Sequence, residues 1–288
     1  MPRIARAVRS ARGQAPTSGR HEGLVIALAR GLDLLRAFGP GGERLGNAEL
    51  ARRTGLPRAT VSRLTDTLVR LGYLRHDPGA EKYALGPGVL MLGYGYLATT
   101  GVVELARPLM QALAEETGCG VALGIADRHQ MVYLEVCQAD GPLLMRLERG
   151  ARLPIARSAM GRAWLAGLVD VDRRRALRRL EAHYGAEWTG IEPRLRAAFD
   201  DYREHGWCAS EGEWEAGISA VAAPVGLGTA TESMAVNCGG ASRSMPRRAL
   251  ERSYGPRVRE LATAIAAAIE AAPAREGAKK KPESTAHR

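Results

Sequence analysis

The sequence predicts an α+β protein of two domains, a small helical one followed by a larger one that contains a sheet. A chain of 288 residues, 45% of them hydrophobic, is long enough to bury two cores. Residues 47–64 have the pattern of two short helices joined by a tight turn. After residue 118, short apolar runs typical of strands alternate with longer amphipathic segments, which is the pattern of an α+β domain.

The two short helices carry helix start and stop signals around their turn. Asn47 can cap the first helix, and Glu49 is favourable near its N-terminus. Gly55 suits a left-handed C-terminal cap, and Pro57 suits the first turn of the second helix. Two helices joined through such a glycine turn form a helix-turn-helix, whose second helix enters the DNA major groove. The segment therefore predicts a DNA-binding domain.

The flanking segments complete this domain. Leu24–Phe38 has apolar residues at helical spacing, so an amphipathic helix is expected before the helix-turn-helix. Residues 72–85 have the pattern of two short strands around an Asp-Pro-Gly turn. A hairpin directly after a recognition helix is a wing. We therefore predict a winged helix-turn-helix domain over residues 21–86.

The outward face of the second helix is expected to reach base edges near its start. Arginine can pair with guanine, Ser and Thr can contact bases or phosphate, and Ala59 can touch a thymine methyl group. Cations on the wing would meet phosphate or the minor groove. The alternative is that this face is only solvated. The predicted DNA-binding residues are Arg58, Ala59, Thr60, Ser62, Arg63, Arg75 and Lys82.

The charge of the chain is distributed as a DNA-binding half would require. Residues 1–90 carry 15 Lys and Arg against 7 Asp and Glu, whereas residues 91–272 carry 21 against 22. The basic excess lies on the helix-turn-helix half, where it can neutralise phosphates. The basic ends, residues 1–20 and 273–288, are predicted to be a disordered arm and a disordered tail.

The rest of the chain is predicted to form a linker helix over residues 87–101 and an α+β domain over residues 102–272. Helices are expected around residues 104–116 and over Gly161–Leu168, Val171–His183, Ile191–His205 and Pro246–Ala271. Strands are expected over Val121–Ala126, Met131–Val136, Leu143–Leu147, Gly217–Val225 and Ser233–Cys238.

Other classes of protein find no support in the sequence. The four cysteines form no CxxC pair and have no histidine at metal spacing, so we expect buried structural cysteines and no metal site. No run of 18 apolar residues and no signal core is present, which favours a cytoplasmic protein without a membrane contact. The chain lacks HExxH, GxSxG, a Walker loop and GxGxxG after a strand, so neither an enzyme nor a cofactor is expected.

Several motifs, in order, resemble the IclR-type transcriptional regulators from about residue 24 to residue 271. They are the helix-turn-helix 50–64, Gly72-Tyr73-Leu74, Tyr83-Ala84-Leu85-Gly86, Arg152-Leu153-Pro154, residues 158–163, residues 206–213, and Val221-Ala222-Ala223-Pro224-Val225. Residues 92–97, 153–162 and 211–217 resemble more narrowly the branch that regulates protocatechuate and 4-hydroxybenzoate catabolism.

The resemblance implies a regulator that binds double-stranded operator DNA and controls catabolic genes in response to a ligand. It implies an effector-binding domain with a curved antiparallel sheet, which holds a small organic acid, and for this branch an aromatic carboxylate. It also implies a homodimer or homotetramer. Two-fold assembly would match a pseudo-palindromic operator. Ligand binding would change operator affinity through the Leu90–Thr100 helix.

The resemblance places the effector pocket between the Ser158–Gly161 loop and the late strands. Backbone N–H groups at the start of the following helix favour a carboxylate, and Ser158 can add a hydroxyl donor. Ser210 stands where the family usually has Asp or Asn, and Ala220 stands where some members have Cys, which leaves the ligand open. The implied effector residues are Ser158, Ala159, Met160, Gly161, Ser210, Ala220, Asn237 and Cys238.

Arginines crowd the loop before this pocket, and one of them can clamp a carboxylate. They are Arg146, Arg149, Arg152 and Arg157, and the alternative is that they are solvated surface residues. Two other functions also remain open from the sequence. One is an enzyme that acts on a small organic acid and carries a DNA-targeting domain. The other is a DNA-binding protein that responds to no ligand.

Overall fold

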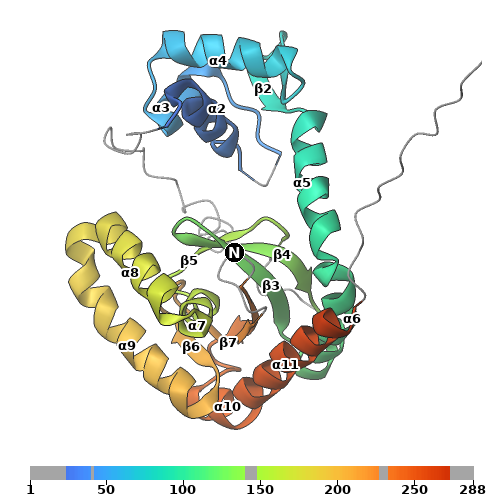
Figure 1. Cartoon of the computed structure of the whole chain (residues 1–288), viewed down its shortest axis with the longest axis vertical. Helices are drawn as coiled ribbons and strands as arrows, with labels where there is room; N and C mark the ends of the chain where they lie inside the picture. Colours follow the sequence, from blue (N-terminus) through green and yellow to red (C-terminus); the bar gives the residue numbers. More distant parts are fainter. Residues whose placement is uncertain (1–23, 40–41, 140–147, 227–232, 273–288) are drawn as a thin grey trace, which may run out of the picture.

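The computed structural model describes residues 24–39, 42–139, 148–226 and 233–272. A small helical domain lies beside a larger sheet domain, and a helix at one side joins the two (Figure 1). The predicted α+β architecture is confirmed. The predicted arm 1–20, tail 273–288 and strand Leu143–Leu147 lie outside the described residues.

The N-terminal domain has the predicted order of three helices and a hairpin. Its elements are α2 (Ile26–Arg36), α3 (Asn47–Thr54), α4 (Arg58–Arg70), β1 (Leu74–Asp77) and the antiparallel β2 (Lys82–Leu85). Apolar residues at helical spacing place Leu34, Leu50, Val61 and Leu68 in one core, together with Leu74 of the wing. The winged helix-turn-helix prediction is therefore confirmed.

The helix-turn-helix differs from expectation at the start of α3. Gly55 ends α3 in the left-handed conformation, with φ 71°, as predicted. Helix α3, however, is preceded by Gly46 in an extended conformation, and Asn47 is its first helical residue. The Asn47 side chain is thus free to bridge the two helices, and its Nδ2 donates to Ser62 Oγ at 2.6 Å. Pro57 is the residue immediately before α4.

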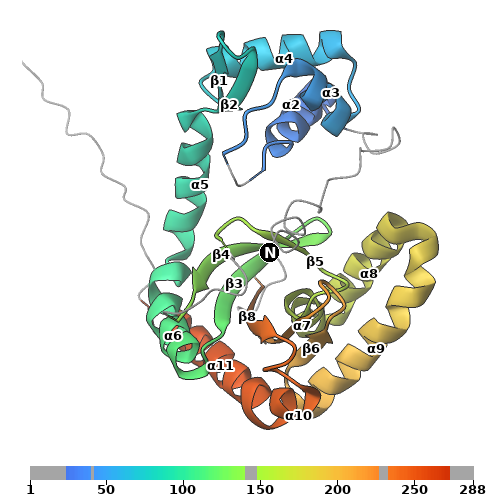
Figure 2. The ribbon, with the colours of Figure 1, turned by 180° about the vertical axis from the view of Figure 1, so that it is seen from behind.

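Helix α5 (Pro87–Thr100) connects the domains, and Gly101, with φ 55°, separates it from α6 (Val102–Thr117). The larger domain contains one antiparallel sheet of six strands in the order β5-β4-β3-β8-β7-β6. The strands are β3 (Gly120–Asp127), β4 (Gln130–Cys137), β5 (Arg152–Pro154), β6 (Cys208–Glu211), β7 (Ile218–Val225) and β8 (Met234–Ala241). The sheet curls, as the resemblance implied (Figure 2). Strand β5 was not predicted, and β6 was expected only from the resemblance of residues 206–213 to the family's late β region, because runs of three and four residues are recognisable only by their pairing partners.

Helices cover both faces of the sheet (Figures 1 and 2). Helices α6 and α11 (Gly255–Ala271) enclose one core, and α7 (Ala159–Gly167) and α9 (Trp188–His205) enclose the other. Between α7 and α9 lie α8 (Asp170–Tyr184) and the short η1 (Gly185–Glu187). The four cysteines, all within the described residues, are buried and free.

The predicted helix Pro246–Ala271 is interrupted. It consists of α10 (Arg247–Ala249), the π-helical turn η2 (Leu250–Tyr254) and α11. A β-carbon on Gly255 would lie 2.3 Å from the Trp207 ring, so only glycine fits at the start of α11. The turn lets the chain pass this buried tryptophan, a long-range constraint that helical periodicity does not reveal.

Candidate functional site

The exposed face of α4 and the wing form one candidate site. Arg58, Ala59, Ser62 and Arg63 are exposed near the start of α4, whereas Thr60 is half-buried. On the wing, Arg75 and Lys82 are exposed as well. Ser62 Oγ accepts the hydrogen bond from Asn47, so its own hydroxyl proton is the group left for a contact outside the domain.

Ion pairing distinguishes the arginines that stabilise this domain from those of the candidate site. Arg53 binds Glu43 and Glu49, and Arg44 binds Asp77. Within the described residues, the cations predicted to contact DNA form no ion pair; these are Arg58, Arg63, Arg75 and Lys82. Four unpaired cations on α4 and the wing suit a surface that neutralises phosphates.

A small pocket in the larger domain forms the second candidate site. It lies between the N-terminus of α7 and one face of the sheet. Its wall is mostly apolar, with a few polar groups, which is typical of small-molecule sites. The lining residues are Tyr133, Leu153, Ser158, Ala159, Ser210, Trp214, Ile218, Ala220, Asn237 and Gly239.

Asn237 is the polar group of this wall that lacks a full set of partners. Its side chain is 4% exposed, and its Nδ2 donates to Tyr133 Oη at 3.4 Å. Its Oδ1 is buried and has no hydrogen-bond partner. Burial raises the pKa of Tyr133, so the phenol stays protonated and its O–H remains a donor. The Tyr133–Asn237 pair therefore offers one donor and one acceptor.

The N-terminus of α7 supplies backbone donors to the same cavity. Ser158 caps the helix, and its Oγ accepts from the Gly161 N–H at 3.2 Å. Ser158 Oγ also donates to the Pro154 carbonyl at 2.8 Å, so the hydroxyl donor expected for a ligand is already used within the protein. The N–H groups of Ala159 and Met160, at the start of α7, have no intrahelical acceptor. They and the helix dipole favour an anion there.

Five of the eight predicted effector residues line this cavity, namely Ser158, Ala159, Ser210, Ala220 and Asn237. The other three residues are not among its lining residues. Met160 packs against the sheet, because a β-carbon on Gly124 would lie 2.6 Å from its Sδ. Gly161 approaches the backbone of Ile155 so closely that a β-carbon would lie 2.2 Å from the Ile155 carbonyl oxygen. Cys238 faces the core under α6, because successive strand residues point to opposite faces.

The loop arginines are not free to clamp a carboxylate. Arg149 binds the buried Glu135, which Arg107 also binds. Arg152 binds Asp127 at 2.9 Å, and Arg157 binds Glu187 at 2.5 Å. Arg146 lies outside the described residues. Each of the three described arginines thus already has a carboxylate partner.

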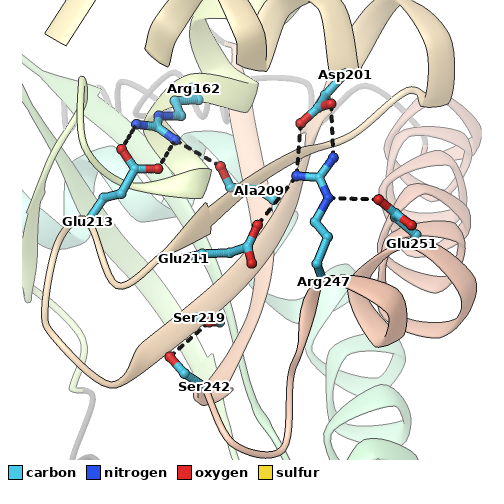
Figure 3. A network of polar contacts seen from close by, with 9 residues as sticks. All are labelled: Arg162, Asp201, Ala209, Glu211, Glu213, Ser219, Ser242, Arg247 and Glu251. Atoms are coloured by element: carbon cyan, nitrogen blue, oxygen red, sulfur yellow. Dashed lines mark hydrogen bonds and ion pairs between the residues drawn. The ribbon is translucent and has the colours of Figure 1, made fainter. Parts of the chain in front are cut away.

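A buried ion pair fixes the wall that carries Trp214 (Figure 3). Arg162 of α7 binds Glu213 through its two terminal guanidinium nitrogens, at 2.7 and 2.6 Å, and one of them, Nη1, also donates to the Ala209 carbonyl at 3.0 Å. Arg194 of α9 donates to the same carboxylate at 2.9 Å. Burial raises the pKa of Glu213, but hydrogen bonds and charge from the two arginines outweigh it and lower that pKa overall. The turn before Trp214 is therefore held to two helices.

Sequence reasoning missed Tyr133, Leu153, Trp214, Ile218 and Gly239 as lining residues. Leu153 lies in a motif quoted for the resemblance, and Tyr133 lies in a predicted strand. Alternation along the strand would have placed Tyr133 on one face or the other. It does not say which face meets α7.

Comparison with known proteins decides what this architecture is. The model for the IclR helix-turn-helix domain matches residues 27–78, and the model for the bacterial transcriptional regulator IclR C-terminal matches residues 94–267. This chain belongs to the IclR family. It is accordingly a DNA-binding transcriptional regulator and not an enzyme, as the sequence predicted.

IclR-family relatives match over most of the chain. The HTH-type transcriptional regulator TsaQ1/TsaQ2 of Comamonas testosteroni is 36% identical, over 87% of this chain and 90% of its own length. The Pca regulon regulatory protein of Pseudomonas putida is 30% identical, over 70% and 69%. The crystal structure of an IclR family regulator from Brucella abortus has a TM-score of 0.75 and 42% identity, over 88% and 96%. In the part of this chain that the structure describes, no helix is long and apolar enough to cross a bilayer.

Proposed function

We propose that this IclR-family regulator binds operator DNA through α4 and the wing, and that an aromatic carboxylate in the α7 cavity controls that binding. The observation that carries the ligand proposal is the buried, unpartnered Oδ1 of Asn237 in the wall of this cavity. An unpaired buried acceptor costs free energy, and a ligand that donates a hydrogen bond to it removes that cost.

The wall indicates how such a ligand would lie. Its carboxylate would accept hydrogen bonds from the free N–H groups at the start of α7. Its ring would contact Leu153, Ile218 and Trp214. A hydroxyl substituent would donate to Asn237 Oδ1 and accept from the Tyr133 O–H. The p-hydroxybenzoate hydroxylase transcriptional activator of Acinetobacter baylyi, 30% identical over 76% of this chain, bears a name that agrees with this class of compound.

DNA reading would follow the usual division of the winged helix. Arg58 and Arg63 would reach base edges from α4, with Ala59, Thr60 and Ser62 beside them. Arg75 and Lys82 would contact phosphate or the minor groove from the wing. The unpaired state of the four cations in the described structure supports this role, because no internal carboxylate has to be displaced.

Assembly as a homodimer, or as a homotetramer built from dimers, completes the proposal. Helices α2 and α5 expose large apolar side chains, which a monomer in water does not favour. These are Leu24, Val25, Ile26, Leu28 and Leu32 on and just before α2, and Leu90, Met91, Leu92, Tyr94 and Tyr96 on α5. A two-fold pairing through them would present two recognition helices to half-sites about one DNA turn apart.

Fluorescence anisotropy on the DNA upstream of the gene, against scrambled DNA, tests the proposal. We expect preference for the upstream DNA and a change in affinity with one of a panel of aromatic and short-chain acids. Arg58→Ala should cost roughly 1–3 kcal/mol on the specific site and little on scrambled DNA. Specific binding that no acid changes would refute the ligand part. Equal loss on both DNAs would make Arg58 a phosphate contact.

A further inference from the structure

Ion pairs join the winged domain to the sheet domain at the turn between β3 and β4. On the sheet side, Asp127 and Arg128 lie at this turn. Asp127 accepts from Arg36 of α2 at 3.4 Å, and Arg128 donates to Asp33 of α2 at 3.0 Å. Arg128 adopts a positive φ of 60°, a conformation uncommon for a residue with a side chain. The turn thus presents the negative Asp127 and the positive Arg128 to side chains of opposite charge on α2.

The same turn is joined to the wall of the cavity. Asp127 also accepts from Arg152 of β5 at 2.9 Å. The next residue, Leu153, lines the cavity. Beyond it, the Ile155 N–H donates to the His129 carbonyl of the turn at 3.1 Å. Strand β5 is short and lies at the edge of the sheet, so it is held mainly by β4 and by these contacts. A ligand that shifts Leu153 therefore moves a direct partner of Asp127.

On the other side, α2 is packed against the recognition helix. Leu34 of α2 and Phe38 just after it share one core with Leu50 of α3 and with Val61 and Leu68 of α4. Close-packed helices transmit a displacement, because their side chains interdigitate. A shift of α2 is therefore a shift of the surface that carries α4.

The strength of these contacts suits a reversible connection. Arg36, Arg128 and Arg152 are each close to half exposed, so their ion pairs are individually weak and sensitive to salt. Allosteric coupling free energies are themselves small, and a ligand can bias contacts of this size. Several weak bonds that must form together make the connection cooperative.

We propose that the Arg152–Asp127–Arg36 and Arg128–Asp33 ion pairs, here called the interdomain bridge, transmit the state of the cavity to the recognition helix. This regulation rests on the function proposed above, in which the cavity holds the effector. It acts beside helix α5, the connection expected from the sequence. In the ligand-free protein the bridge holds α2 at one position. A ligand that displaces β5 weakens the bridge and releases α2.

Hydrogen exchange on the full ligand-free chain tests the bridge from a distance. Arg152→Gln alters a side chain whose ion pair is with Asp127 and not with a residue of α2. It is nevertheless expected to speed amide exchange in α2 by about two- to fivefold, because losing a weak ion pair shifts a local opening equilibrium by that factor. The reciprocal variant, Arg36→Gln, should speed exchange in the segment 152–158. Glu192→Gln removes the exposed pair of Glu192 with Arg196 in α9 and should change neither segment.

A pair of charge-reversal variants distinguishes loss of the bridge from loss of folding. Asp33→Arg and Arg128→Asp singly place like charges together and should speed exchange in α2, whereas the double variant should return it toward wild type. Asp tolerates the positive φ at position 128 better than most residues. Exchange in α2 that stays at the wild-type rate in Arg152→Gln would overturn the bridge.

A ligand arm separates failure of the bridge from failure of the proposed effector. With 4-hydroxybenzoate as the probe, Arg152→Gln should bind the probe at least as tightly as wild type does in calorimetry, because binding no longer has to weaken the bridge. The change that the probe causes in operator affinity should shrink toward none. If the variant retains the full wild-type response, the bridge is refuted. If the wild type does not bind the probe or any acid of the panel, the effector proposal fails, and the exchange experiment still decides the bridge.

Discussion

Asn237 has a buried acceptor, Oδ1, that lacks a partner within the protein and that the proposed ligand would pair. Its amide lies in a β-strand that is otherwise apolar, on the face toward α7. Only one of its two polar groups has a partner in the protein. Cys238, the next residue, faces the opposite core, where the hydrogen bond with Cys238 lowers the pKa of Cys119 to about 7. Asn237 and Cys238, which are adjacent on β8, thus face opposite sides of the sheet.

Asn237→Leu is expected to weaken effector binding by about five- to a hundredfold, because a ligand hydroxyl left unpaired in a buried site costs about 1–3 kcal/mol. The melting temperature of the ligand-free protein should change little, since the variant removes an unpaired buried acceptor and also the donor to Tyr133 Oη. Calorimetric titration and thermal unfolding measure the two effects. Cys238→Ala, on the same strand, should leave ligand affinity unchanged. Unaltered binding in Asn237→Leu would exclude Asn237 from the site.

At the scale of elements, α7 connects the cavity to its surroundings. Its N-terminus faces the cavity, and Arg162 in its second turn holds the turn that carries Trp214. Arg247 of α10 forms a similar set of ion pairs nearby, with Asp201, Glu211 and Glu251 (Figure 3). Both clusters tie strand β6 and its following turn to helices. A short strand with few backbone bonds needs such side-chain contacts.

Glu213→Gln should lower the free energy of unfolding by about 1–3 kcal/mol, because it leaves the buried Arg162 without its charged partner. Ligand affinity should fall as Trp214 loosens, while operator affinity without ligand stays the same. Glu215→Gln, in the same turn, is the matched control. Chemical denaturation and titration provide the readouts. A Glu213→Gln protein as stable as the control would contradict this account.

The same pair predicts a pH dependence. The pKa of Glu213 in the folded protein lies below its ordinary value of 4.5. Its stabilising contribution is therefore fully present above pH 4.5 and is lost as the pH falls through the folded pKa. The stability difference between wild type and Glu213→Gln should accordingly narrow as the pH falls below 4.5 and through the folded pKa.

At the scale of the whole molecule, the two domains meet through charged contacts, while apolar side chains remain exposed on α2 and α5. Charged contacts allow one domain to move relative to the other. Exposed apolar surface instead favours a lasting contact with a second copy. The fold thus separates the flexible connection within a chain from the stable one proposed between chains.

Leu92→Glu should convert the proposed dimer into a monomer, because it places a charge in the apolar surface of α5. Light scattering after size exclusion would then give half the wild-type mass. Val171→Glu in α8 is the matched control, since both side chains are 59% exposed. A Leu92→Glu protein of unchanged mass, or a wild type that is already monomeric, would exclude pairing through α5.

Local signals in the sequence predicted the winged domain well. Gly55 and the apolar spacing of α4 act within a few residues, whereas the pocket beside the Ser158–Gly161 loop was implied only by the family resemblance. The resemblance to a family extended this to the whole chain. Strand β5 and the break before Gly255 were not predicted, and β6 was expected only from the resemblance, because all three depend on contacts with distant residues.

Residue types at short spacing are enough to predict the helix-turn-helix, the basic half of the chain and the family. Tertiary packing, in contrast, sets which side chains face the cavity and which charges are already paired. Strand alternation makes Asn237 and Cys238 point to opposite faces, but the packing of α7 on one face selects Asn237. Likewise, Arg152 and Arg157 became ion-pair partners, while Arg58 and Arg63 stayed unpaired, because folding brought carboxylates only to the first two.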